Sequence, residues 1–252
     1  MIVQPEDEKI IRQWQVLTRI CLDGESQSRL AGLLNHINRL SARQAASAHA
    51  EIETAYFLAQ AGFSLAFLEA TGGRTADLEC YEGTHRFFVE VTVIQSTRGS
   101  LRKPRKVGQP HQIPESSDEF FEQALVKRLL SRMAEKAKQL ERYCAPVLLA
   151  VSIPDLPREK GRSHEIPPLD LQRLAAMLVG VLVEIPQFSA VLLTFWKAAA
   201  QESRNPIRIR EVSWITRPVG DSRDPRIRLL ATNPGARYRL TTRELRIVQE
   251  AM

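Results

Sequence analysis

Apolar residues in the first sixty positions recur at the three- and four-residue spacing that is typical of amphipathic helices. This spacing predicts one helix over residues 6–22 and a second over residues 28–39. Ser41 is the expected N-cap of a third, long helix that ends at Gly62. We interpret residues 1–45 as an N-terminal helical extension, and its helices show no chemistry of their own.

Beyond Gly62 the apolar spacing changes to the alternation that is typical of strands. Strands are predicted over residues 63–69, 75–81 and 86–94. The last two flank Gly83-Thr84, which has the composition of a tight hairpin turn. We therefore expect these two strands to pair antiparallel.

The remaining elements complete an α/β pattern. A segment over residues 96–117, rich in glycine, proline and basic residues, is expected to be a loop. After it the pattern predicts a helix over 118–143, a strand over 146–153, a helix over 169–184, strands over 190–196, 207–215 and 227–232, and a closing helix from Thr242. We expect one α/β domain over 46–252, with a core at about 50–153 and a C-terminal elaboration over about 154–252.

The composition is that of a globular protein rather than of a fibrous, disordered or disulfide-stapled one. The chain has 252 residues, of which 44% are hydrophobic and 25% are charged. Its three cysteines are odd in number and far apart, as is typical of a reducing compartment. The N-terminus has no apolar signal segment, and the longest apolar run, residues 174–183, is too short to span a bilayer. We expect a cytoplasmic protein that does not enter membranes.

The charge balance is compatible with a nucleic-acid partner. The formal net charge is +6 and the isoelectric point is about 9.5, and neutralisation of phosphates supplies most non-specific affinity for nucleic acid. Part of the excess gathers in the loop that follows the strand over 86–94. The candidate nucleic-acid-binding residues there are Arg98, Arg102, Lys103, Arg105 and Lys106. The alternative is that this loop is simply solvated.

Two acidic residues are predicted to meet across the hairpin. If Gly83-Thr84 forms a two-residue loop, Glu82 faces His85, and the same register places Asp77 directly opposite Glu90. Opposed side chains in a ladder have Cβ atoms roughly 4.5–5.5 Å apart, so two carboxylates there repel unless a cation or a proton lies between them. Oxygen ligands this close favour a hard cation such as Mg²⁺. The alternative is a polar face that exposes two unrelated acids.

The order of elements around these acids resembles a known superfamily. A helix that carries Glu51 precedes a strand, then Thr75-Ala76-Asp77-Leu78, a hairpin, Phe88-Val89-Glu90-Val91-Thr92, a helix and a strand. This order resembles the core of the PD-(D/E)xK nucleases, the restriction-endonuclease-like fold. The first helix is similar to that of archaeal Holliday-junction resolvases. The resemblance covers about residues 50–153.

The chain departs from this pattern at two positions. Ala76 stands where the superfamily has proline, a mild change, and Thr92 stands where it has the motif lysine. That lysine normally positions the attacking water and offsets phosphate charge, which threonine cannot do in the same way.

The next helix offers a replacement for the motif lysine. Lys136, Gln139 and Tyr143 lie on one face of this helix, and Gln139 and Tyr143 resemble the QxxxY motif of RecB-like members. We take Lys136 as the replacement, with Lys103 and Lys106 of the loop as alternatives. A lysine on an amphipathic helix more often simply faces solvent.

The resemblance implies a metal-assisted hydrolysis. Asp77, Glu90 and the backbone carbonyl of Val91 would hold Mg²⁺ or Mn²⁺, and Glu51 would support the ion directly or through water. The metal polarises the scissile phosphate and activates a water molecule, which Lys136 would orient. The residues implied to position the substrate are Gln139, Tyr143 and Thr92.

The sequence therefore predicts a metal-dependent nuclease that hydrolyses phosphodiester bonds, most simply in DNA. The alternative is a catalytically degenerate nuclease fold that binds nucleic acid or a protein partner without cleavage, which Thr92 favours. A third interpretation is a structural α/β domain. A homodimer is left open.

Overall fold

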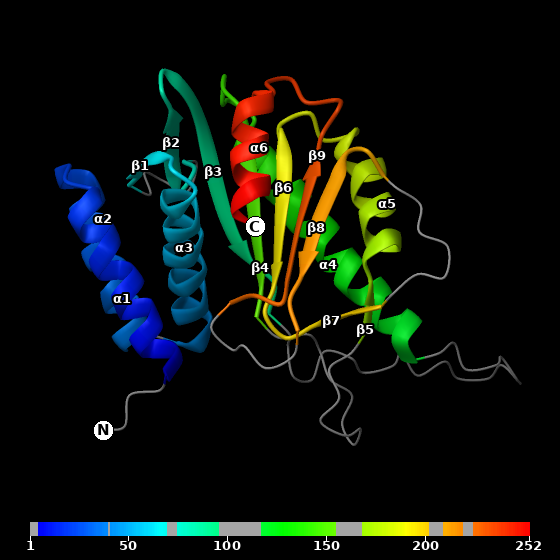
Figure 1. Cartoon of the computed structure of the whole chain (residues 1–252), viewed down its shortest axis with the longest axis horizontal. Coiled ribbons are helices and arrows are strands. Elements are labelled where there is room, and N and C mark those ends of the chain that lie inside the picture. Colours follow the sequence, from blue (N-terminus) through cyan, green and yellow to red (C-terminus); the bar gives the residue numbers. More distant parts are fainter. Residues whose placement is uncertain are drawn as a thin grey trace, which may run out of the picture.

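The computed structural model describes residues 5–39, 41–69, 75–95, 117–154, 168–201, 209–218 and 224–252 and combines helices with strands (Figure 1). Within these ranges the helices are α1 (Pro5–Ile20), α2 (Gly24–Arg39), α3 (Ala42–Gln60), α4 (Ser117–Gln139), α5 (Leu171–Leu182) and α6 (Thr242–Ala251). All six correspond to helices predicted from the apolar spacing, with bounds that differ by a few residues.

The strands form one mixed seven-stranded sheet and one small sheet. They are β1 (Ser64–Phe67), β2 (Leu78–Glu82), β3 (His85–Val93), β4 (Val147–Ile153), β5 (Pro168–Asp170), β6 (Ala190–Phe195), β7 (Ala199–Gln201), β8 (Val212–Thr216) and β9 (Ile227–Thr232). The large sheet has the order β1-β2-β3-β4-β6-β9-β8, and β5 pairs with β7 in the small one. The predicted α/β class is confirmed.

Strand direction divides the large sheet into three parts. β1, β2 and β3 form an antiparallel meander, β3, β4 and β6 run parallel, and β9 and β8 add two antiparallel pairings at the far edge. The parallel connections pass through α4 and α5, because parallel neighbours need a crossover.

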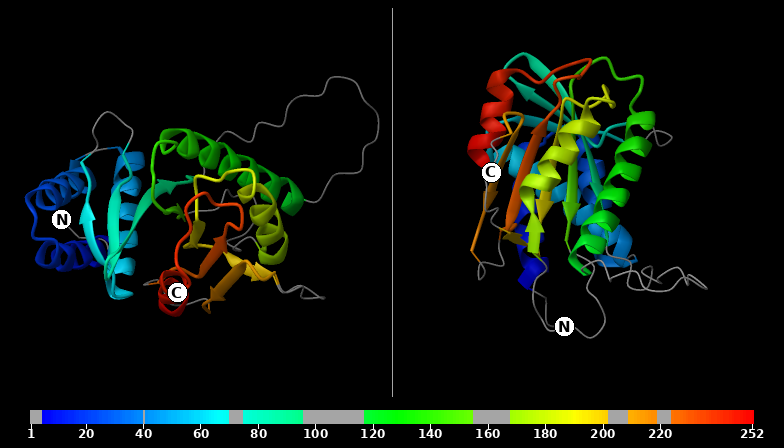
Figure 2. Two further views of the ribbon diagram at one scale, coloured as in Figure 1. Left: turned by 90° about the horizontal axis from the view of Figure 1, so that it is seen from above. Right: turned by 90° about the vertical axis from the view of Figure 1, so that its right-hand side faces the viewer.

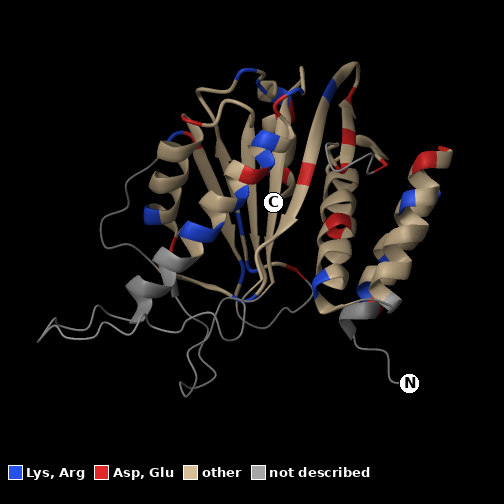
Figure 3. Cartoon of the chain, turned by 180° about the vertical axis from the view of Figure 1, so that it is seen from behind, with Lys and Arg blue, Asp and Glu red and all other residues tan. Residues whose placement is uncertain are grey.

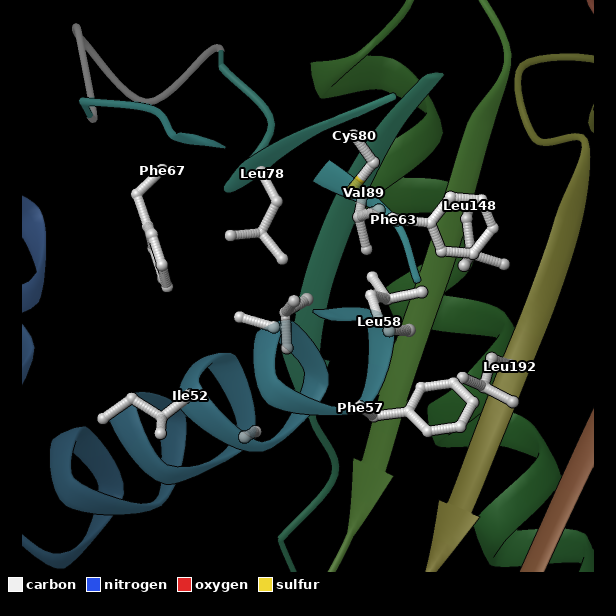
Figure 4. Close-up of a cluster of buried hydrophobic side chains, with 14 of the residues drawn as sticks. Ile52, Phe57, Leu58, Phe63, Phe67, Leu78, Cys80, Val89, Leu148 and Leu192 are labelled. Atoms are coloured by element: carbon white, nitrogen blue, oxygen red, sulfur yellow. The ribbon is translucent and has the colours of Figure 1, made fainter. Parts of the chain in front are cut away.

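Helices cover both faces of the sheet. The apolar residues of α4 and α5 pack with one set of alternate residues of β4, and those of α3 and α6 pack with the other set. Figure 2 shows α4 and α5 on one side of the strands and α6 on the other. Figure 4 shows the second core, in which Leu58 of α3 lies close to Val89 and Leu148 of the sheet.

The predicted hairpin register is confirmed. Glu82 pairs with His85, Cys80 with Phe87 and Leu78 with Val89. The turn places Gly83 at φ +59°, which is a left-handed conformation that glycine adopts readily. The local sequence was sufficient here because a two-residue loop fixes the register of a hairpin.

The N-terminal helices share a core with the rest of the chain. Leu17 and Leu30 are buried in the same cluster as the apolar residues of α3 and β1. The Ser26 hydroxyl of α2 accepts a hydrogen bond from the backbone amide of Phe67 at 2.8 Å. This bond fixes α2 against the edge strand β1. It therefore also fixes the position of Arg29, which lies three residues further along α2.

Two local expectations differ from the structure. Ser41 precedes α3, but its side chain makes no capping bond to the helix backbone, and its hydroxyl instead donates to the Gln44 side chain at 3.1 Å. The strands β5 and β7 were not predicted, because three residues are too few to show an alternating pattern. Asp170, which ends β5, caps α5 by accepting from two backbone amides.

Within the described ranges, no helix combines the length and the apolar character that crossing a bilayer requires.

Gly62 is expected to be required by the backbone at the end of α3. Its φ is +100°, and a Cβ added there would meet no atom within 4 Å, so a side chain would cause conformational strain without a clash. Gly62→Ala should lower the free energy of unfolding by about 1–2 kcal/mol in urea denaturation. The control is Gly180→Ala within α5, where there is also open space and where alanine should stabilise by up to about 1 kcal/mol. Equal effects of the two substitutions would contradict this account.

Candidate active site

The candidate site lies at the N-terminal end of β2, where this strand begins beside β3. The ladder between these strands stops at the pair of Leu78 and Val89, whereas β3 continues to pair with β4 through Val93. The amides of Phe88 and Ile94 donate towards the β4 side, so the alternating amide of Val91 points to the side that β2 has left. Among the described residues, no strand pairs with this side of β3 beyond Val89.

Asp77 fills the place that β2 leaves. Its carboxylate Oδ2 accepts a hydrogen bond from the Val91 amide at 2.7 Å, and its own amide donates to the carbonyl of Val89 at 3.0 Å. We expected Asp77 directly opposite Glu90 in a regular ladder, but it lies one residue beyond the last pair and binds β3 partly through its side chain. The reason is that the carboxylate itself satisfies the amide that a strand partner would otherwise bond.

Three carboxylates converge around this point. Glu51 reaches it from α3 and is 4% exposed, and Glu90 reaches it from β3 and is 1% exposed. Burial raises the pKa of Glu51 to about 7 and that of Glu90 to about 8, and the charge on Asp77 adds to both increases. Burial also raises the pKa of Asp77, against the lowering effect of the Val91 amide and of Lys136 and Arg29. Figure 3 shows acidic positions on α3 and on the β2–β3 hairpin.

Two cations compensate these acids from opposite sides. Arg29 of α2 binds Glu51 with two hydrogen bonds, Nε to Oε1 at 2.9 Å and Nη2 to Oε2 at 2.8 Å, and its Nη2 lies 3.7 Å from Asp77 Oδ1. Lys136 of α4 forms a short ion pair with Glu90 Oε1. Buried charges require such partners, since desolvation would otherwise exclude them.

Gln139 at the end of α4 and Tyr143, which lies just beyond this helix and not within it as predicted, also hold the segment before Asp77. Gln139 accepts from the Lys136 ammonium at 3.0 Å and donates to the carbonyl of Thr75 at 3.2 Å. The Tyr143 hydroxyl accepts from the amide of Ala76 at 2.6 Å. The residues that resemble QxxxY therefore lie against the backbone that positions Asp77, whereas the contact with substrate implied for them stays a prediction.

The other predicted site residues divide into two groups. Thr92 lies two residues after Glu90 on the same face of β3 and is buried, so it belongs to the neighbourhood of the site. The basic loop residues lie outside the described residues. These are Arg98, Arg102, Lys103, Arg105 and Lys106.

The residues present fit a divalent ion held by two carboxylates rather than by three. Within the described ranges, no three His, Cys, Asp or Glu side chains are grouped closely enough to hold a metal. Mg²⁺, however, is commonly bound through one or two carboxylates, with water and substrate phosphate completing its shell. Glu90 Oε2 is buried and has no hydrogen-bond partner among the described residues. A buried oxygen without a partner needs an explanation, and a metal ion that it would bind supplies one. Asp77 and Glu90 therefore fit the ion, whereas Glu51 is already bound to Arg29.

Arg29 is the site residue that the sequence analysis missed. It belongs to α2, in the N-terminal extension, to which we assigned no chemistry. It is separated from Glu51 by 22 residues, and no helical spacing relates the two. The only signal in the sequence is a basic residue beside the apolar stripe of α2, which is common on surface helices.

Comparisons of the chain with protein-family models, with curated proteins and with solved structures find no match. The site is therefore interpreted from its own residues.

The raised pKa of Glu90 predicts a pH-dependent stability for the metal-free protein. Glu90 titrates at about 8 in the fold against an ordinary value of 4.5, so between these values the folded state keeps a proton that the unfolded state has lost. Stability should therefore fall as pH rises through this interval. Glu90→Gln should reduce the fall by up to about 1 kcal/mol per pH unit, measured by urea denaturation with a chelator present. Lys138→Ala, exposed on α4, is the control and should retain the wild-type pH dependence.

Proposed function

We propose that this chain is a Mg²⁺- or Mn²⁺-dependent nuclease with a restriction-endonuclease-like core, which hydrolyses phosphodiester bonds in DNA. The observation that carries the proposal is the convergence of Asp77, Glu90 and Lys136 on one largely buried point, from the residue before β2, from β3 and from α4. A solvated polar face would not gather acids whose burial is this costly.

The order and direction of the elements support the same conclusion. α3, β1, β2, β3, α4 and β4 follow one another, the first three strands are antiparallel, and β3 and β4 are parallel. This is the order expected for the restriction-endonuclease-like core. Because a fold hosts many functions, the proposal depends on the site and not on this order.

In the proposed mechanism, Asp77 and Glu90 would hold the divalent ion. When bound, such an ion polarises the scissile phosphate and lowers the pKa of a coordinated water. Asp77 is oriented by the Val91 amide, and the segment before it is fixed by Gln139 of α4 and by Tyr143 just beyond this helix. These contacts hold the carboxylate in place before substrate arrives.

Lys136 supplies the positive charge that Thr92 cannot. Its ammonium contacts Glu90 and Gln139, so it is held beside the acid that would bind the metal. From there it can orient the attacking water or stabilise the charge that develops on the phosphate. This side chain comes from a helix rather than from β3, but it reaches the same carboxylate.

One observation favours binding without cleavage as the second candidate function. Arg29 and Lys136 already form ion pairs with the acids, so part of the compensation that a metal would supply comes from the chain itself. DNA binding that weakens steeply with salt, without metal-dependent cutting, would select this alternative.

Cleavage of plasmid, linear and branched DNA with Mg²⁺ or Mn²⁺ tests the preferred function. Asp77→Asn and Glu90→Gln should each lower the rate at least about a hundredfold, because each removes a ligand of an ion whose contribution is several kcal/mol. The matched control is Lys138→Ala, which should cut at the wild-type rate. Metal-dependent cutting that survives both acid substitutions would refute the site.

Lys136 has a separate test. Lys136→Met should lower the cleavage rate by about 10²–10⁴-fold, and Lys136→Arg should recover part of the loss, since it keeps the charge but not the geometry. Lys138→Ala again serves as the control on the same helix. A wild-type rate for Lys136→Met would show that another group supplies the charge.

A further inference from the structure

We propose that Arg29 is a built-in counter-cation of the metal site, which competes with the divalent ion for Asp77 and so sets the metal affinity from the N-terminal helix α2. This inference rests on the proposed function because it concerns the same site. It concerns metal binding rather than cleavage, so each can fail without the other.

The first argument is which carboxylate oxygens remain for a metal. Asp77 Oδ2 accepts from the Val91 amide, whereas Oδ1 receives no hydrogen bond from the described residues, so Oδ1 is the oxygen more available to a metal. Glu90 Oε1 is paired with Lys136, which leaves Oε2, buried and without a partner among the described residues. A metal held by Asp77 and Glu90 would therefore use Asp77 Oδ1 and Glu90 Oε2.

The second argument is that Arg29 lies against one of these two oxygens. Its Nη2 is 3.7 Å from Asp77 Oδ1. A divalent ion that binds Oδ1 must therefore approach a guanidinium, and like charges at this range repel strongly where water is largely excluded. The contact with Asp77 is the long one, so it is the one that the ion displaces.

The third argument is that Arg29 cannot simply turn away. Both of its hydrogen bonds to Glu51 are short, and the carboxylate that receives them is almost fully buried. α2 itself is fixed to β1 by the bond between Ser26 and Phe67. The guanidinium thus stays near Asp77 and also occupies both oxygens of Glu51, so Glu51 anchors Arg29 and is not a direct ligand of the metal.

The charges of the cluster explain what Arg29 and Lys136 contribute to the metal-free protein. Three carboxylates that meet largely out of water would destabilise the metal-free protein, and Arg29 and Lys136 offset part of that repulsion. The same compensation makes a divalent ion bind less tightly than it would to uncompensated acids. Arg29 of the N-terminal helix α2 thereby lowers the affinity for the metal and at the same time stabilises the metal-free fold.

The experiment is Mn²⁺ binding to the full chain without nucleic acid, measured from the electron paramagnetic resonance of free Mn²⁺. Arg29→Met should bind Mn²⁺ about tenfold more tightly than wild type, because a repelling charge is removed. Arg29→Lys keeps the charge and should stay within about threefold of wild type. Arg86→Met is the matched control, since it also removes an arginine and an ion pair, with Glu79 on the hairpin, and it should not change the affinity.

Unchanged or weaker binding by folded Arg29→Met, or no Mn²⁺ binding by either protein, would overturn the inference. If this variant does not fold, the wild type decides through nuclear magnetic resonance. The Arg29 Nε–H signal should shift on titration with Mg²⁺, and binding of Mg²⁺ without such a shift would overturn the inference as well. DNA cleavage is measured separately. If the wild type cuts DNA but Arg29→Met binds Mn²⁺ no more tightly than wild type, the proposed function stands and the inference on Arg29 fails. If Arg29→Met binds Mn²⁺ more tightly but the wild type does not cut DNA, the inference stands and the proposed function fails.

Discussion

The repulsion among Glu51, Asp77 and Glu90 is the constraint on which the arrangement of this protein depends. Carboxylates gathered largely out of water must be protonated, paired or bound to a metal. Here, cations reach them from two helices, Arg29 from α2 and Lys136 from α4. The positions of both helices are therefore tied to the site as well as to the apolar core.

The three carboxylates can meet because β2 begins only at Leu78, so β3 has no β2 partner beyond Val89. Glu51 comes from a helix on one face of the sheet and Lys136 from a helix on the other, and an intact strand beside β3 would keep them apart. Asp77 spans the opening, since its carboxylate replaces the missing strand at Val91 and is influenced by both cations. The interruption in the pairing of the sheet thus allows side chains from both faces, Glu51 and Lys136, to approach Asp77.

α4 combines two tasks that are often assigned to different elements. Its apolar side packs on the sheet, and its polar side holds the backbone before Asp77 through Gln139 and pairs with Glu90 through Lys136; Tyr143 follows just beyond the helix. The ring of Tyr143 packs edge-on against Phe88 with centroids 4.7 Å apart, while its hydroxyl bonds the amide of Ala76. Packing and site geometry therefore depend on the same side chains, and a change in one is expected to disturb the other.

The sequence by itself determined what depends on neighbours along the chain. It predicted the helices, the register of the β2–β3 hairpin and the face of α4 that carries Lys136, because turn length and helical spacing fix these locally. Tertiary structure decided the rest: the offset of Asp77 from the ladder, the short strands β5 and β7, and above all the pairing of Arg29 with Glu51. That pairing depends on how α2 packs against α3 and β1, and no local pattern encodes the meeting of two side chains on separate helices.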